Sequence, residues 1–278
     1  MGTRHALGIA ITASMIWTFH ASAASDAEQC FANPRPECLV HAALEGAQSA
    51  TPPEYRASLL EEIAGLRVEI GDTDGGRETL ATALSEAASI AEPRSRADLL
   101  CSLAQRQAKI GDATGARQTL TGAIQLIEHE LAKGYGESSF TLTHTLRGCA
   151  TAQKSVGDGA GAAATLRRLS ESLGAVRPSS RYEEMIVTGR AQAEVGDAEG
   201  ARATLLAARH LAQSLPPGAD RATQLAAVGG EQLRIGATAE GRSTLEDAVA
   251  AYSAVSDPVE RHRVETLIAM QLLSLSRR

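Results

Sequence analysis

The sequence has little of what strands and aromatic cores are built from. Only 3% of its 278 residues are aromatic, Trp17 is the single tryptophan, and lysine occurs only at positions 109, 133 and 154. Aromatic and β-branched clusters favour strands, whereas the alanine and leucine that abound here favour helices. The composition therefore predicts an all-α protein.

Sequence signatures of catalysis and metal binding are also missing. There is no HExxH, GxSxG, P-loop or CxxC pattern, and the adjacent residues Glu128, His129 and Glu130 would point to different faces of a helix. The glycine-rich stretch 157–161 has no strand before it, which argues against a phosphate-binding loop. We therefore expect no enzyme activity, no cofactor and no metal. An envelope enzyme or small-molecule sensor stays open as the alternative, because residues distant in the sequence can still converge.

Positive charge is in the minority. The formal net charge is −6, and the sequence contains no block of basic residues. Nucleic acids and anionic membrane surfaces attract strongly basic proteins. We expect neither of them as a partner.

The N-terminus has the pattern of a secretory signal peptide. An apolar stretch at 6–19 is too short to span a bilayer, and Ala21-Ser22-Ala23 offers a cleavage site, with a second choice one residue later. We predict a signal peptide at 1–23 and a mature bacterial-type chain at 24–278 that is periplasmic or secreted and has no membrane span. A retained membrane anchor is the alternative, which the short apolar stretch disfavours.

Four cysteines follow this segment, and an even number in an exported chain suggests disulfides. Cys30 and Cys38 flank a turn with two prolines, which can bring them together. Cys101 and Cys149 form the possible second pair, provided that the fold brings their Cα atoms within about 7 Å. The alternative is four reduced, buried thiols.

One short motif, an aliphatic residue followed by Gly and usually Asp, occurs five times. Its glycines are 40, 46, 39 and 40 residues apart, at Gly71, Gly111, Gly157, Gly196 and Gly236. Other positions keep the same register. Seven residues before each glycine stands a small residue: Ala64, Ala104, Ala150, Gly189 and Gly229. Eight and nine residues after it comes Thr-Leu every time, starting at Thr79, Thr119, Thr165, Thr204 and Thr244.

This register predicts two helices per repeat, because apolar and small positions follow a 3.6-residue period on both sides of the glycine. Glycine ends the first helix in a left-handed conformation, and the aspartate caps the second helix. We predict a half repeat at 38–53, a capping helix at 258–278 and five repeats between them, at about 55–92, 94–133, 139–176, 180–216 and 219–256.

The combination of small residues at −7 and +5, Gly-Asp at 0 and +1, and alanine at +12 resembles the tetratricopeptide repeat (TPR) family over nearly the whole mature chain. The chain departs from the family in its period of about 40 rather than 34 residues. It also lacks the usual aromatics at −11 and −4, and glutamine stands at −4 in four repeats. We assign the repeated Gln and Thr to repeat architecture, because five copies in register do not make one active site.

The resemblance implies an α-solenoid of antiparallel hairpins in a right-handed superhelix, and a non-catalytic scaffold that binds a partner peptide or helix on the concave face of the first helices. It places a basic group in the middle of that face: His144, Arg147, Lys154, Arg190 and Arg234. We expect these residues to meet a carboxylate of the partner by charge-assisted hydrogen bonds. The alternatives are that they are ordinary solvated charges, or that the chain associates with itself through the ends of the solenoid.

Overall fold

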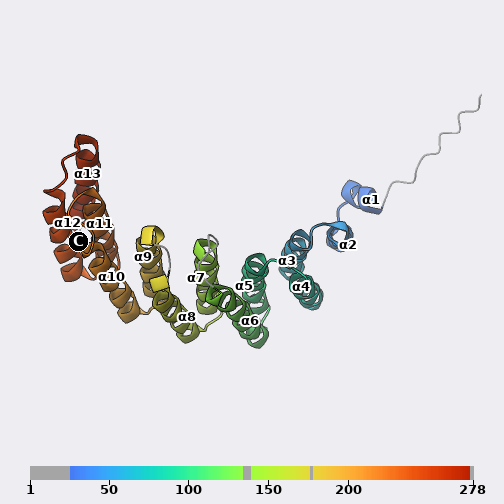
Figure 1. Cartoon of the computed structure of the whole chain (residues 1–278). Coiled ribbons are helices and arrows are strands. Elements are labelled where there is room, and N and C mark those ends of the chain that lie inside the picture. Colours follow the sequence, from blue (N-terminus) through green and yellow to red (C-terminus); the bar gives the residue numbers. More distant parts are fainter. Residues whose placement is uncertain (1–25, 134–138, 176–177, 276–278) are drawn as a thin grey trace, which may run out of the picture. The chain divides into compact units, whose positions relative to one another are not determined.

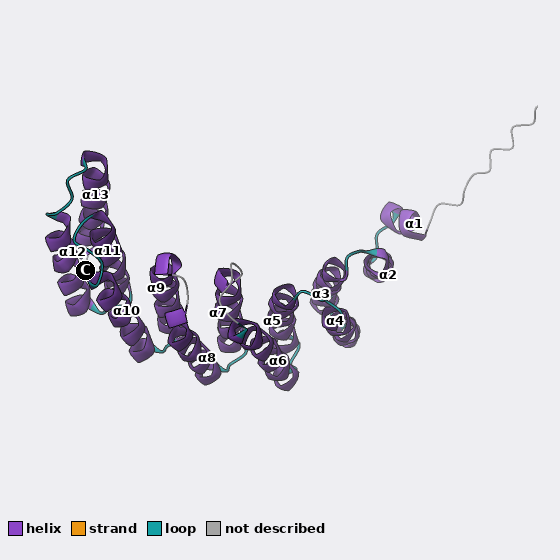
Figure 2. Ribbon diagram, viewed as in Figure 1, coloured by secondary structure: helices purple, strands orange, loops and turns teal. Residues whose placement is uncertain are grey.

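The computed structural model describes residues 26–133, 139–175 and 178–275, and this part of the chain contains thirteen α-helices, one 3-10 turn and no strand (Figure 2). The predicted all-α class is confirmed. The signal peptide predicted at 1–23 and both of its candidate cleavage sites lie outside the described residues. None of the described helices is long and apolar enough to cross a bilayer.

The chain divides into two compact units, residues 1–43 and 44–278. In the first, α1 (Asp26–Ala32) is joined to the start of α2 (Pro36–Ser49) through Cys30 and Cys38, whose Cα atoms lie 5.8 Å apart. This is the disulfide expected from the proline-containing turn.

The second unit holds the end of α2, five helical hairpins and a final helix, α13 (Pro258–Leu275), as Figure 1 shows. The first helices of the hairpins are α3 (Pro53–Glu69), α5 (Pro93–Lys109), α7 (Ser139–Ser155), α9 (Pro178–Val195) and α11 (Ala219–Arg234). The second helices are α4 (Thr73–Ala88), α6 (Ala113–Ala132), α8 (Gly159–Ser172), α10 (Ala198–Gln213) and α12 (Thr238–Tyr252). The predicted α-solenoid of TPR-like hairpins is confirmed by this order.

Each hairpin turns at the glycine of the repeat. These glycines have φ between 83° and 94°, a region that glycine adopts without the steric cost of a Cβ atom. In four hairpins the next residue is an aspartate whose Oδ1 accepts a hydrogen bond of 2.8 to 3.0 Å from the backbone N–H three residues later. The fifth hairpin has Ala237 at this position and no side-chain cap.

Small residues let the two helices of a hairpin approach closely. In the last hairpin, a Cβ atom on Gly229 would lie 3.1 Å from the carbonyl oxygen of Gly241, and one on Gly241 would lie 2.7 Å from Leu233. Leucines such as Leu205 and Leu245 then fill the space between the helices and are fully buried. The small positions of the repeat are therefore required by packing.

Arginines in the first turn of a helix donate to carbonyl groups of the linker before it. Arg56 of α3 donates to the carbonyl of Ala50 at 3.1 Å, and Arg261 of α13 donates to that of Val255 at 3.0 Å. Arg221 of α11 does the same for the carbonyl of Leu215 at 3.4 Å. Because linker carbonyls have no partner in a helix or strand ladder, these arginines hold each linker against the start of the next hairpin or of α13.

Candidate functional site

The first helices and α13 form one continuous row, because each packs against the first helix of the next hairpin. We call the contact between two successive first helices a seam. All five basic residues proposed to bind a partner lie on helices of this row, on α7, α9 and α11. Specific side-chain links cross four of its seams.

The seam between α3 and α5 is linked by a carboxylate. Glu61 accepts a hydrogen bond from Ser102 at 2.6 Å and lies 3.8 Å from the guanidinium of Arg106. The seam between α5 and α7 is linked by the second predicted disulfide, in which the Cα atoms of Cys101 and Cys149 lie 5.3 Å apart. This covalent link spans the longest interval between repeats, 46 residues, part of which lies outside the described residues.

The seam between α7 and α9 contains a buried ion pair. Arg147 Nη1 lies 2.6 Å from Glu184 Oε2, and the side chains are 12% and 0% exposed. The positive charge of Arg147 is thus matched and almost covered. Four polar atoms on the described part of these two helices are buried without a hydrogen-bond partner, namely Glu184 Oε1, Thr145 Oγ1, Thr188 Oγ1 and Gln192 Nε2. Arg147 is therefore paired with Glu184 inside the fold and is not an exposed, unpaired cation on the surface.

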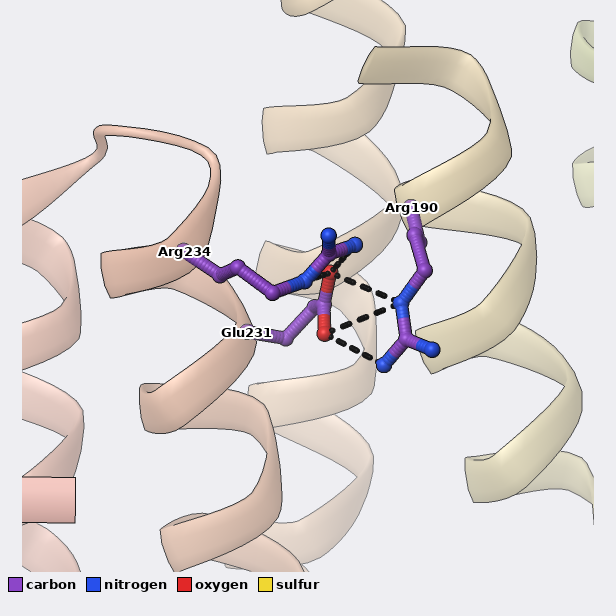
Figure 3. A network of polar contacts seen from close by, with 3 residues as sticks. All are labelled: Arg190, Glu231 and Arg234. Carbon is purple, nitrogen blue, oxygen red and sulfur yellow. Dashed lines mark hydrogen bonds and ion pairs between the residues drawn. The ribbon is translucent and has the colours of Figure 1, made fainter. Parts of the chain in front are cut away.

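The seam between α9 and α11 contains two arginines around one carboxylate, as Figure 3 shows. Arg190 Nη2 lies 2.7 Å from Glu231 Oε2, and Arg234 Nε lies 2.8 Å from Glu231 Oε1. Glu231 is 4% exposed, whereas the side chains of Arg190 and Arg234 are 43% and 46% exposed. We call these three residues the triad. Its two guanidiniums and one carboxylate carry a formal charge of +1, and Glu194 lies close enough to attract Arg190 as well.

Electrostatics keep the triad ionised. Burial alone would raise the pKa of Glu231, but the hydrogen bonds from Arg190 and Arg234 outweigh it and lower that pKa. The hydrogen bonds that Arg190 donates to Glu231 raise the pKa of Arg190. The two guanidiniums are therefore held in place by a carboxylate that stays charged at neutral pH.

The other two predicted residues lie on α7. Lys154 is exposed, and its Nζ donates to the backbone carbonyl of Glu194 on α9. His144 is exposed on the same helix. The structure thus brings Arg190 and Arg234 together through a shared carboxylate, ties Arg147 and Lys154 to α9, and places His144 in none of these links.

Sequence reasoning missed the acidic partners, Glu184 and Glu231. The repeat gave little signal for them, because neither position is uniformly apolar. The position of Glu184 holds Leu59, Leu99, Thr145 and Gln224 in the other hairpins, and that of Glu231 holds Leu66, Arg106, Ala152 and Ala191. Their burial, which makes a counter-charge necessary, follows from the packing of the row.

The recurring Gln and Thr form a polar network inside the hairpins. Thr Oγ1 donates to Gln Oε1 at 2.6 to 2.9 Å in four hairpins, through the pairs Thr119–Gln107, Thr165–Gln153, Thr204–Gln192 and Thr244–Gln232. In the first hairpin Arg67 takes the place of glutamine and binds both Asp72 and Thr79. The assignment of Gln and Thr to architecture agrees with these contacts.

A further repeat feature escaped the sequence reasoning. The residue three after each capping aspartate is a glycine, namely Gly75, Gly115, Gly161 and Gly200. A Cβ atom there would lie 2.1 to 2.3 Å from the Oδ2 atom of the aspartate. Where Ala237 replaces the aspartate, Glu240 replaces the glycine. The two positions change together because the carboxylate fills the space that a Cβ atom would need.

Within the described residues, no three His, Cys, Asp or Glu side chains are grouped in a way that could hold a metal ion. No protein-family model matches the chain, and no curated protein matches it.

Several solved structures match the chain at low sequence identity. TPR-like repeats assigned to a kinesin light chain of Podosopora anserina match 73% of this chain and 97% of that one, at 18% identity and a TM-score of 0.40. BtubC (BKLC) from P. vanneervenii matches over 79% and 91%, at 17% identity and a TM-score of 0.36. Ton1535 from Thermococcus onnurineus NA1 matches over 87% and 77%, at 12% identity and a TM-score of 0.38.

Proposed function

We propose that this protein is an exported, non-catalytic scaffold that binds an acidic segment of a partner protein on its row of first helices. The triad is the observation that carries this proposal. It offers two half-exposed guanidiniums, held in position by a buried carboxylate, and it keeps a net charge of +1.

Guanidiniums suit this task because each has five N–H donors in a fixed plane and can bind a carboxylate through two of them. Glu231 occupies only part of this donor set. Holding both side chains in place beforehand lowers the entropy that binding would otherwise cost. A carboxylate of the partner would therefore find donors that are already oriented.

We assign the remaining predicted residues by their surroundings. Lys154 and His144 are exposed on α7 and would extend the contact along the row. Arg147 is committed to Glu184 and almost covered, so we propose that it positions α7 against α9 instead of meeting the partner.

The proposal of export rests on the predicted signal peptide and on two disulfides. Disulfides persist in oxidising compartments such as the bacterial periplasm and are rare in the cytosol. Fusion of residues 1–30 to a reporter that is active only outside the cytoplasm tests this. An inactive reporter, or free thiols in protein isolated from its native cells, would contradict export.

The triad is tested with two fluorescent peptides of equal length, one rich in Asp and Glu and the other carrying Asn and Gln at the same positions. We expect the acidic peptide to bind with an affinity that falls with added salt, and the amide peptide to bind at least tenfold more weakly. Changing Arg190→Gln and Arg234→Gln together should remove the preference. Arg202→Gln with Arg242→Gln, exposed on second helices, is the matched control. Equal binding of both peptides would contradict the proposal.

Self-association through the ends of the row stays a prediction. Met270 and Leu273 on α13 are each 63% exposed, and Val259 is 76% exposed. Light scattering on the purified chain distinguishes a monomer from a larger assembly at each concentration.

A further inference from the structure

Open clefts lie between successive second helices, on the other side of each hairpin from the seams. Two of them flank α10. The cleft between α8 and α10 has a volume of about 330 Å³, and the one between α10 and α12 has a volume of about 260 Å³. Glu199 and Ala203 of α10 line both. At each cleft, the repeated glutamine of the hairpin, Gln192 or Gln232, forms part of the lining.

These two glutamines differ from those of earlier hairpins in their amide nitrogen. In the second and third hairpins, Nε2 of Gln107 and Gln153 donates to the capping aspartate at 3.2 and 3.3 Å. Gln192 is fully buried, and its Nε2 has no hydrogen-bond partner. A buried donor without an acceptor is costly, and it marks a place where an acceptor would bind favourably.

The hairpin of Gln192 also differs from the others in its contact with Arg167 of α8, the only basic residue at its repeat position. Its guanidinium binds both oxygens of Asp197, at 2.7 and 2.6 Å, across the cleft between α8 and α10. These hydrogen bonds lower the pKa of Asp197 more than burial raises it, so the carboxylate stays charged and paired. Arg167, and not Gln192, is therefore the side chain that binds the capping aspartate in this hairpin.

The neighbouring cleft lacks the same acceptor for a different reason. Ala237 replaces the aspartate of the repeat, so the carboxylate that accepts from the glutamine in the second and third hairpins is missing here. Its Oε1 accepts from Thr244 at 2.6 Å, and its side chain is 2% exposed. In two successive hairpins, therefore, the side-chain N–H of the glutamine does not donate to a capping aspartate as it does in the second and third hairpins.

The charge around both clefts is negative. The charged lining consists of the carboxylates Glu171, Glu199 and Glu240 and the guanidiniums of Arg167 and Arg202. Arg167 binds Asp197 and also attracts Glu199, so that four carboxylates, with Asp197 included, stand against two guanidiniums. Glu171, Glu199 and Glu240 are exposed. A ligand complementary to this surface carries positive charge and hydrogen-bond acceptors.

We propose that the two clefts beside α10 form a binding site for a lysine- or arginine-bearing peptide, whose backbone carbonyls accept from Gln192 and Gln232 and whose basic side chain pairs with Glu199. A peptide supplies carbonyl acceptors and a cation within one residue, and these complement a lining of amide donors and carboxylates. The site lies between second helices where they meet α9 and α11, and it shares no residue with the triad.

The probe is an acetylated and amidated Ala-Lys-Ala tripeptide, added to the isotope-labelled, disulfide-intact chain. We expect saturable shifts of the side-chain amide signals of Gln192 and Gln232. The same tripeptide with norleucine in place of lysine should bind at least threefold more weakly, because it lacks the charge. Shifts that spare both glutamines would place the peptide elsewhere and overturn the proposal. No shift of either glutamine at any probe concentration would mean that only water fills the clefts, and would overturn it too.

Arg167→Ala separates the hydrogen bond from simple charge attraction. It frees Asp197 to accept from Gln192, as in the second and third hairpins, while making the cleft more negative. We expect binding of the lysine tripeptide to fall three- to tenfold, the range for one hydrogen bond. Tighter binding would show that charge alone attracts the peptide and would overturn the role of Gln192. Arg168→Ala, which removes the ion pair with Glu128 in the preceding cleft, is the matched control and should leave binding unchanged.

Discussion

The seam between α5 and α7 and the seam between α9 and α11 join corresponding faces of successive first helices by different chemistry. The first is closed by the Cys101–Cys149 disulfide, and the second by a buried carboxylate between two arginines. The repeat thus determines where two helices meet but leaves open what links them. The covalent link lies where the connection between hairpins is longest, whereas the ionic link keeps exposed charge that a partner can use.

The largest expected effect comes from opening the covalent seam. Changing Cys101→Ala and Cys149→Ala should lower the free energy of unfolding by about 4 kcal/mol, the loop-closure value for a separation of 48 residues. Urea unfolding followed by circular dichroism measures it. Changing Cys30→Ala and Cys38→Ala is the control and should leave the main transition almost unchanged, because that disulfide lies within the first unit. A larger loss from the control pair would contradict the comparison.

The next effect separates the two ionic seams. Glu184→Gln should cost about 3 kcal/mol of unfolding free energy, because it leaves the nearly covered Arg147 without a counter-charge. Glu231→Gln should cost less, about 1 kcal/mol, because Arg190 and Arg234 are almost half exposed and can turn to water. The same urea experiment compares them. The reverse order would show that the triad is a structural ion pair instead of a surface site.

The dependence of stability on pH tests the contribution of Glu231 separately. Because the pKa of Glu231 is lowered in the folded chain from its ordinary 4.5, its contribution to stability is present above that pH and is lost as the pH falls through the lowered value. The stability of the wild-type chain should therefore fall below about pH 4.5 more steeply than that of the Glu231→Gln variant. Parallel curves would contradict the lowered pKa.

The smallest effect concerns the hairpin turns. Gly115→Ala should destabilise the chain by about 1 to 2 kcal/mol, because its Cβ atom would lie 2.1 Å from Oδ2 of Asp112 and would displace the carboxylate that caps the helix. In an Asp112→Ala background the same change should stabilise by up to about 1 kcal/mol, because alanine is the better helix former. A double-mutant cycle measures the coupling. Additive effects would show that the Asp and Gly positions of the repeat are independent.

Much of the fold could be predicted from the sequence, because its determinants are local. Gly71 and its four counterparts must end a helix, since only glycine adopts positive φ without steric cost. Small residues such as Gly229 show where helices approach, and the even number of cysteines indicated the two disulfides. These features depend on nearest neighbours along the chain or on a register that repeats.

The candidate site could be predicted only in part, because it depends on how one helix is rotated against the next. The sequence offered five basic residues on one face, and the structure paired Arg147 inward with Glu184 while leaving Arg190 and Arg234 at the surface. A charged side chain needs an oppositely charged partner when it is buried, and which side chains are buried depends on how the first helices pack against one another.

The sequence by itself determined a helical repeat and its turns, because both follow from backbone sterics or from periodicity, whereas the Cys101–Cys149 pair required the packing of successive hairpins. Only the tertiary structure decided which charges neutralise each other, that Arg167 and not Gln192 binds Asp197, and that α10 lies between two clefts. These outcomes join side chains about 30 to 40 residues apart, and a contact over that separation exists only once neighbouring hairpins have packed.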